Sequence, residues 1–144
     1  MGQNITRRRF NTMVTAPLVA LAGCAATGRG SDGAEALLKR VKAYWLALES
    51  NDHITAWSFE EVSKDPKWTL QSYLQVGGVG YEAAQVRDVR SIEGDRALVD
   101  VWTKYSLPML RLKGQESVVQ DEWRRIDGQW YHVLNKGSLF KTKK

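Results

Sequence analysis

The chain has 144 residues, which is the length of a single domain. Its hydrophobic fraction of 43% and its six Trp indicate a packed globular body and exclude a disordered chain. The formal net charge of +5 arises mostly at the two ends, from Arg7–Arg9 and from the lysines at 136, 141, 143 and 144. Because the central part is close to neutral, the sequence argues against a nucleic-acid partner.

A single cysteine, Cys24, excludes an intramolecular disulfide and a metal site built on several cysteines. There are two histidines, and the carboxylates do not follow the spacing of a calcium loop. We therefore expect no metal site, and no motif indicates a bound cofactor.

The N-terminus has the pattern of an export signal. Residues 1–12 are polar and basic, and residues 13–22 are a short, moderately apolar run. Ten such residues are too few to span a bilayer as a helix, which needs roughly 20, but they suit the apolar region of a signal peptide. The alternative is a disordered basic N-terminus on a cytosolic protein.

Two short motifs in this region resemble known export and lipidation signals. Residues 6–10, with Arg7, Arg8 and Phe10, resemble the twin-arginine motif, although Asn11 and Thr12 depart from its usual continuation, so twin-arginine and general secretory export both stay open. The run Leu21, Ala22, Gly23 and Cys24 resembles the bacterial lipobox.

The lipobox resemblance implies that Cys24 receives a diacylglyceryl group and becomes the first residue of the mature chain, whose amino group is then acylated, with palmitate as a typical acyl chain. Two or more acyl chains hold a protein stably on a bilayer. We therefore expect a lipid-anchored protein on the periplasmic side of the cell envelope. Ala25 stands where Asp would indicate inner-membrane retention, so the outer membrane is the expected location.

The expected organisation has four parts: an export signal at 1–23, the lipidated cysteine and a linker at 24–31, a folded domain at 32–135, and a basic tail at 136–144. The tail is expected to be solvated or to touch anionic headgroups.

Three helices are predicted in the first half of the domain. Asp32, with Glu35 three residues later, has the spacing of a capping box and opens an amphipathic helix of about four turns. A second, short helix is expected after the cap at 50–52. The pair Asp65–Pro66 predicts the start of a third helix.

The second half has the alternation of β-strands. Strands are predicted at 82–92, 96–105, 118–126 and 129–134, with a loop between Pro108 and Gly114 and a two-residue hairpin at Asp127–Gly128. Helices followed by an antiparallel meander predict an α+β fold with the helices on one face of the sheet.

This order of elements, together with the Trp123-to-Trp130 closing hairpin and the run at 94–99, resembles the nuclear transport factor 2-like, or cystatin-like, superfamily over residues 33–134. The resemblance implies a cone in which a curved sheet and the helices enclose a cavity. The superfamily includes ketosteroid isomerase-type and dehydratase enzymes, small-molecule binders and envelope proteins without chemistry, so the fold does not fix the function.

The hairpin register places candidate site residues on one face of the sheet. Trp123 is expected opposite His132, which puts Asp121 diagonally from His132 and within side-chain reach. This Asp/His pair could act as general acid and base; the alternative is that Asp121 merely satisfies polar groups at the cavity rim. Further side chains are expected to line the cavity: Tyr44, Trp45, Tyr105, Trp123 and Trp130.

The other face of the sheet suggests a binding surface. If Val99 and Val101 point inward, Leu98 and Trp102 point outward and can contact a second copy or an envelope partner; the alternative is that the loop at 106–116 covers them. The preferred hypothesis is a lipoprotein that binds a partner protein or a small hydrophobic ligand. The alternative is an enzyme of the isomerase or dehydratase type that transfers protons in the cone.

Overall fold

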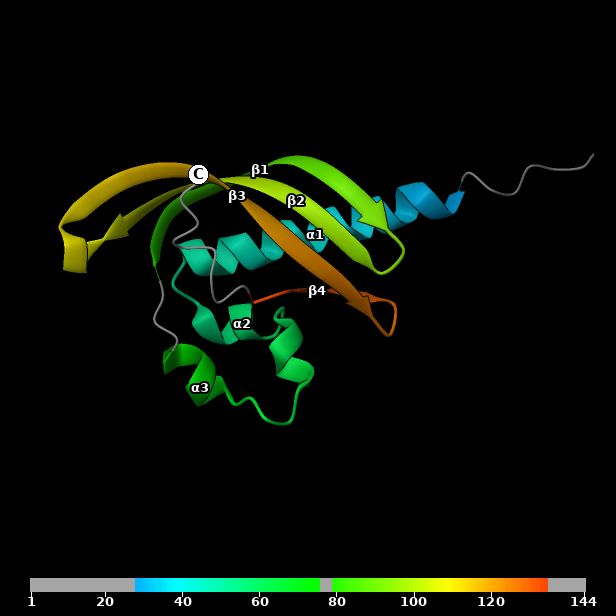
Figure 1. Cartoon of the computed structure of the whole chain (residues 1–144), viewed down its shortest axis with the longest axis horizontal. Coiled ribbons are helices and arrows are strands. Elements are labelled where there is room, and N and C mark those ends of the chain that lie inside the picture. The colour runs from blue at the N-terminus through cyan, green and yellow to red at the C-terminus, as the bar shows by residue number, and fades with distance from the viewer. Residues whose placement is uncertain (1–27, 76–78, 135–144) are drawn as a thin grey trace, which may run out of the picture.

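The computed structural model describes residues 28–75 and 79–134, with side chains from Gly33 onward. The signal motifs, Cys24 and the basic tail lie outside these residues. Helix α1 (Gly28–Glu49) runs across the concave face of a curved antiparallel sheet with strand order β1-β2-β3-β4 (Figure 1). Shorter elements below it are α2 (His53–Trp57), the 3-10 helix η1 (Glu61–Lys64) and α3 (Leu70–Gln75). The predicted α+β plan, with helices packed on one side of a curved antiparallel sheet, is confirmed.

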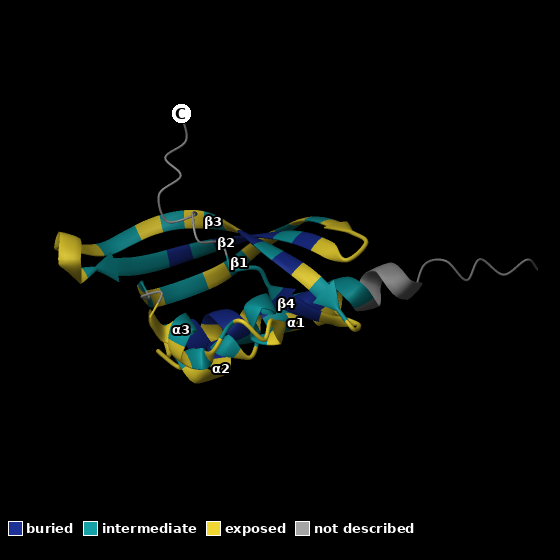
Figure 2. Ribbon diagram, turned by 60° about the horizontal axis from the view of Figure 1, so that its bottom comes forward, coloured by how far each residue is buried: buried dark blue, intermediate teal, exposed yellow. Residues whose placement is uncertain are grey.

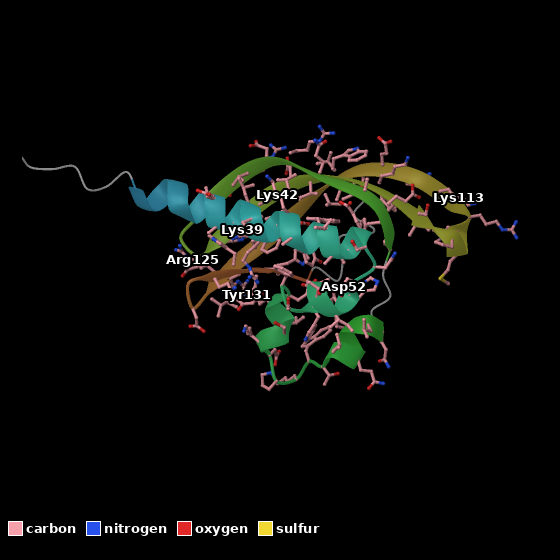
Figure 3. All side chains as sticks on the ribbon, turned by 180° about the vertical axis from the view of Figure 1, so that it is seen from behind. Lys39, Lys42, Asp52, Lys113, Arg125 and Tyr131 are labelled. Atoms are coloured by element: carbon pink, nitrogen blue, oxygen red, sulfur yellow. The ribbon has the colours of Figure 1, made fainter. Side chains whose placement is uncertain are left out.

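Helix α1 is amphipathic, as its sequence indicates. Leu37 and Val41 are fully buried against the sheet, whereas Lys39 and Lys42 point outward to solvent (Figure 3). The predicted start at Asp32 is wrong, because the helix begins at Gly28 and Asp32 lies inside it. Residues 28–31 contain no proline, so nothing in them prevents the helix from extending toward the N-terminus.

The short helices are capped by their own side chains. Asp52 accepts a hydrogen bond of 3.0 Å from the Thr55 N–H at the start of α2, as predicted. The prediction that Asp65–Pro66 opens the third helix is wrong: α3 begins at Leu70. Thr69 and Ser72 explain this start, since the hydroxyl of each accepts a hydrogen bond from the backbone N–H of the other.

The sheet consists of β1 (Gly80–Glu93), β2 (Arg96–Leu107), β3 (Leu112–Ile126) and β4 (Gln129–His132). The predicted hairpin at Asp127–Gly128 is confirmed, with φ of 49° and 79° at the two turn residues. Positive φ at both positions is the geometry of the two-residue turn that Asp-Gly favours.

Strand β3 begins at Leu112 instead of residue 118, so the predicted loop between Pro108 and Gly114 is wrong in extent. The ladder between β2 and β3 continues to the pair Leu107 and Leu112. The chain reverses through the 3-10 helix η2 (Pro108–Leu110) and Arg111, whose φ is 55°. Gly114 accommodates its φ of 59° inside β3, because a glycine has no Cβ to clash there. The result is one long β-hairpin.

Strand β1 gives the sheet much of its curvature. Its register against β2 shifts three times, at Glu82, Arg87 and Arg90. An extra residue in one strand of an antiparallel pair bends that strand and increases its twist. The bend wraps the sheet around α1, as Figure 1 shows.

Alternation along β2 separates the two faces of the sheet. Val99 and Val101 are fully buried toward α1, and Leu98 and Trp102 on the opposite face are only half-buried. The buried segments lie between the sheet and α1 in Figure 2. The predicted inward and outward faces of β2 are therefore confirmed.

Candidate functional site

A buried carboxylate, Glu60, lies where the helices meet the last strand. It follows the turn after α2 and forms an isolated parallel bridge with His132 of β4. The His132 backbone N–H donates to the Phe59 carbonyl over 2.7 Å. These backbone contacts bring Glu60, which is 0% exposed, next to the His132 ring.

Both carboxylate oxygens of Glu60 have protein partners. The hydroxyls of Tyr44 and Tyr73 donate to Oε1 over 2.8 and 3.3 Å, and Nδ1 of His132 lies 2.9 Å from Oε2. A carboxylate buried without such partners would be strongly destabilising. Glu60 thus joins side chains from α1, α3 and β4.

A second carboxylate lies on the other side of the imidazole. Oδ1 of Asp121, on β3, is 3.7 Å from Nε2 of His132. Its Oδ2 accepts a 2.7 Å hydrogen bond from the indole N–H of Trp45 on α1. We call Glu60, His132 and Asp121 together the buried ion cluster.

Aromatic rings enclose the buried ion cluster. The Tyr44 ring stacks on the His132 ring with centroids 4.4 Å apart, and the Trp123 ring meets it edge-on at 5.5 Å. The His132 side chain keeps 12% of its surface exposed, against 8% for Asp121. The cluster is therefore separated from most of the solvent.

The two carboxylates decide the charge of His132. Burial by itself lowers the pKa of the imidazole, but the nearby charges of Glu60 and Asp121 outweigh it and raise that pKa to about 10. Burial and the charge of Glu60 also raise the pKa of the Tyr44 and Tyr73 hydroxyls, so both stay protonated donors.

At neutral pH this arrangement is an imidazolium held between two carboxylates. A general base needs a free lone pair near the working pH, and the raised pKa of His132 favours the protonated ring, which has no free lone pair, at that pH. The chemistry that the cluster supports best is charge pairing that ties α1, the Glu60 segment, β3 and β4 together.

The structure brings Asp121 and His132 within reach of each other, and it places the predicted cavity residues in two groups. Tyr105 lies apart from the buried ion cluster: it is half-buried on β2, with its ring 6.3 Å from that of Tyr81. Burial, Asp121 and Tyr105 raise the pKa of Tyr81 to about 12. The other four predicted cavity residues are core side chains with at most 4% exposure: Tyr44, Trp45, Trp123 and Trp130.

The indole N–H of Trp123 differs from that of Trp45. It is buried, and it has no hydrogen-bond partner among the described residues. Trp123 thus contributes to the core through packing alone.

Sequence reasoning missed Glu60 and the role of Tyr73. Tyr73 lies on α3, and its ring packs against the Trp57 ring with centroids 5.2 Å apart. Glu60 is followed by another glutamate and gave no local signal. Its carboxylate is stabilised in the core by contact with the His132 ring, and His132 is 72 residues away in the chain.

The outer face of the sheet carries the predicted interface residues. Trp102 lies opposite Val118, which is 60% exposed, and the Arg87 guanidinium lies 5.7 Å from the Trp102 ring centroid. Leu98, four positions earlier on the same face, is half-buried. Residues 106–116 form the end of the β2–β3 hairpin.

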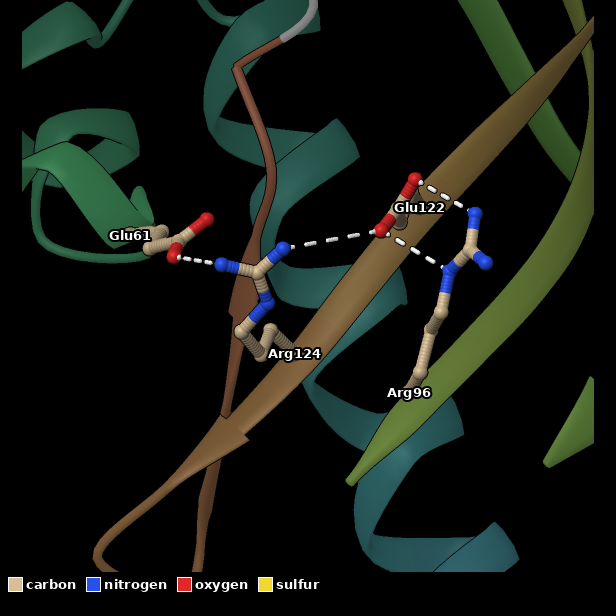
Figure 4. A network of polar contacts seen from close by, with 4 residues as sticks. All are labelled: Glu61, Arg96, Glu122 and Arg124. Carbon is tan, nitrogen blue, oxygen red and sulfur yellow. Dashed lines mark hydrogen bonds and ion pairs between the residues drawn. The ribbon is translucent and has the colours of Figure 1, made fainter. Parts of the chain in front are cut away.

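Ion pairs extend along this outer face toward η1. Arg124 pairs with Glu61 and lies 3.8 Å from Glu122, which in turn accepts two hydrogen bonds from Arg96 (Figure 4). The Arg124 and Arg96 side chains are 48% and 60% exposed, so water screens these pairs.

Among residues 28–75 and 79–134, no group of three or more His, Cys, Asp or Glu side chains is placed to hold a metal ion. No helix in the same ranges is long and apolar enough to cross a membrane.

No protein-family model and no curated protein matches the chain. Solved structures do match the chain. A candidate dehydratase of the NTF2-like family from Streptomyces avermitilis is 23% identical, with a TM-score of 0.47, and the match covers 73% of this chain and 95% of that one. A candidate NTF2-like transpeptidase from Campylobacter jejuni is 15% identical, with a TM-score of 0.45, and the match covers 66% and 94%.

A third similar structure is a Nostoc punctiforme protein of unknown function with a cystatin-like fold. It is 14% identical, with a TM-score of 0.45, and the match covers 69% of this chain and 86% of that one. The activities in these names belong to those proteins.

Proposed function

We propose that this protein is an envelope lipoprotein, anchored by acyl chains on Cys24, whose domain binds a partner protein through the outer face of the sheet. The observation that carries the proposal is the filling of the concave side. Tyr44, Trp45 and Trp123, each at most 4% exposed, occupy the space between α1 and the sheet. A small ligand there would have to displace core side chains, which favours a protein partner on the outside.

The charge state of the buried ion cluster supports the same proposal. His132 is held as an imidazolium, and Glu60 already accepts from two tyrosines and faces the imidazolium. A group whose proton is retained up to pH of about 10 is poorly matched to proton transfer at neutral pH.

The outer face offers suitable binding chemistry around Trp102. Its half-buried ring lies opposite exposed Val118, and the Arg87 guanidinium lies over the ring, 5.7 Å from its centroid. Tryptophan and arginine are enriched where protein interfaces concentrate their binding energy. A second copy of the chain would be a homodimeric form of the same binding.

The anchor is tested by fractionation and by the mass of the N-terminal peptide. In bacteria, the wild-type chain should sediment with membranes and begin at an acylated Cys24. A Cys24→Ser variant should be retained with an uncleaved leader or lose its acyl chains. An unmodified Cys24 in membrane-extracted wild-type protein would overturn the anchor.

The binding surface is tested by crosslinking from position 102 in intact envelopes. A photoreactive phenylalanine analogue replaces Trp102, and the matched control carries it at Lys39, which is exposed on α1. We expect a discrete adduct from position 102 and none from position 39. An adduct of twice the chain mass identifies the homodimer. Equal labelling from positions 102 and 39 contradicts the proposal that the partner binds through the outer face of the sheet.

A second candidate function, proton-transfer catalysis, is favoured by one observation. Asp121 and His132 approach to 3.7 Å beside buried Glu60, and clusters of ionisable groups with shifted pKa values are common in active sites. This candidate requires His132 to lose its proton near neutral pH. Titration of the His132 ring by 15N nuclear magnetic resonance separates the two functions.

A further inference from the structure

The end of the β2–β3 hairpin is a surface that the proposed function does not use. It projects beyond the helices, at the opposite end of the domain from the start of α1 (Figure 1), and Lys113 marks it in Figure 3. We call residues 107–113 the hairpin tip.

The hairpin tip concentrates exposed apolar side chains. Met109 is 98% exposed, Leu110 is 62% exposed and Leu112 is 41% exposed. Single exposed apolar residues are ordinary, but three of them within four positions at a projecting end are not. They create an apolar surface that faces away from the core.

The tip is held in a defined turn by hydrogen bonds. The Arg111 N–H donates to the Pro108 carbonyl over 3.0 Å, and the Gly114 N–H donates to the Ser106 hydroxyl over 3.3 Å. Ser106 in turn donates to the carboxylate of Glu82. A preformed turn loses little conformational entropy when it binds, which favours its use as a binding element.

Within residues 107–113 the charged side chains, Arg111 and Lys113, have one sign. Between Asp100 and Glu116 the chain carries three basic residues and no acidic one. Lys104 lies 4.0 Å from Glu82. In the part of the chain that the structure describes, neither Arg111 nor Lys113 has an acidic partner.

We propose that the hairpin tip docks on an anionic lipid bilayer, with Met109 and Leu110 entering the headgroup and acyl boundary. Arg111 and Lys113 then lie at the level of the lipid phosphates. Apolar side chains flanked by cations are the combination that binds the membrane interface. A second copy would bring the cations of two tips together, and lysine is depleted in protein interfaces.

This docking does not depend on acylation of Cys24. If the same bilayer holds Cys24, the chain enters the domain at the start of α1, which lies at the opposite end from the tip (Figure 1), and the two attachments would orient the long axis of the domain along the membrane. The experiment therefore uses the chain from residue 24 with Cys24→Ala, which keeps every described element and removes acylation. The outcome for the tip is then independent of the outcome for the anchor.

Because Cys24 is the only cysteine, the Cys24→Ala chain accepts one reporter. Met109→Cys carries an environment-sensitive fluorophore at the tip, and Ile54→Cys carries it at a control position on α2 where the native side chain is 67% exposed. The probes are vesicles of phosphatidylcholine alone and of phosphatidylcholine with phosphatidylglycerol. We expect a blue shift from position 109, and none from position 54, with the anionic vesicles.

Co-sedimentation with the same vesicles measures affinity. Leu110→Asp should weaken binding about tenfold or more, because a charge replaces an apolar side chain in the lipid, and Ile54→Asp should leave binding unchanged. Arg111→Gln with Lys113→Gln should weaken binding to anionic vesicles and reduce its dependence on salt. Thermal melting confirms that each variant folds.

Three results would overturn the proposal. The first is a label at position 109 that stays in water while the protein binds, which would assign binding to the basic tail. The second is equal binding by Leu110→Asp and wild type, or no binding at all. The third is a concentration-dependent blue shift without vesicles, which would assign the tip to a second copy.

Discussion

Nδ1 of His132 lies 2.9 Å from Oε2 of Glu60, although the two residues are separated by 72 positions. The bond connects the segment after α2 to the edge strand β4, and the His132 backbone N–H reinforces it by donating to the Phe59 carbonyl. Helix layer and sheet are therefore joined by charge as well as by apolar packing.

Replacing Glu60 should destabilise the domain strongly. In Glu60→Gln the shape is kept, but the imidazolium of His132 loses a charged partner inside the core. Breaking a buried ion pair from one side costs about 3 kcal/mol or more. Urea denaturation measures this loss in the free energy of unfolding.

Glu61 provides the matched control for Glu60. It is the next residue, and its carboxylate pairs with Arg124, whose side chain is 48% exposed. Glu61→Gln should cost below about 1 kcal/mol, since water screens such pairs. Equal losses in the two variants would contradict the assignment of Glu60 to a buried ion pair.

Stability should decrease as the pH rises above neutral. Folding raises the pKa of His132 from 6.5 to about 10. The contribution of the His132 proton to the free energy of unfolding is therefore complete below about pH 6.5 and is lost progressively up to about pH 10. Within this window the folded state still binds a proton that the unfolded state has released.

Within that window, the free energy of unfolding should fall by about 1.4 kcal/mol per pH unit. Urea midpoints at a series of pH values measure the slope. A His132→Gln variant should be less stable than the wild type below about pH 6.5 and should lack this decline, so the two stabilities should converge toward about pH 10. An identical slope in both proteins would show that another group causes it.

Two buried tryptophans should respond differently to the same substitution. Trp45→Phe removes the indole N–H that donates to Asp121, whereas Trp123→Phe removes an N–H without a partner among the described residues. Both lose similar apolar area. Leaving a buried acceptor unpaired costs about 1–3 kcal/mol, so Trp45→Phe should be the more destabilising by roughly that amount.

Thermal or urea unfolding measures the loss in the free energy of unfolding for Trp45→Phe and for Trp123→Phe. The control is Trp102→Phe on the half-buried outer face, where we expect the smallest loss. If Trp123→Phe were as costly as Trp45→Phe, the hydrogen bond to Asp121 would contribute little.

Arg124, which pairs with both Glu61 and Glu122, should contribute little to the free energy of unfolding. That contribution should decrease as salt is added. Arg124→Met removes the two ion pairs that Arg124 makes in Figure 4, leaves the Arg96–Glu122 pair in place and keeps a largely aliphatic side chain. We expect a loss of about 1 kcal/mol or less in dilute buffer, and none in about 1 M salt, because added ions screen exposed charges. A loss that persists in salt would contradict screening as its cause.

Local patterns predicted the layers of the fold well. The Asp127–Gly128 turn fixed the register between β3 and β4, and through it the approach of Asp121 to His132. Both depend on short-range rules, since turn geometry sets the pairing and pairing sets the faces.

Element ends and the centre of the site depended on long-range contacts. Strand β3 starts at Leu112 because β2 pairs with it there, and nothing in its own residues signals this. Glu60 has the sequence context of a surface glutamate, and only the distant His132 and Tyr44 make its burial stable. Sequence therefore indicated two of the three residues of the buried ion cluster, Asp121 and His132, and missed Glu60.

The most direct test of a structural role for the buried ion cluster is the titration of His132 by 15N nuclear magnetic resonance. We predict that its ring stays doubly protonated above pH 8 in the wild-type chain, in line with a pKa raised to about 10. Glu60→Gln should lower that pKa, and Asp121→Asn should lower it less, because its carboxylate is more distant. A pKa near the ordinary 6.5 would contradict the account. A pKa near 6.5 that Asp121→Asn shifts would favour acid–base catalysis by the Asp121 and His132 pair.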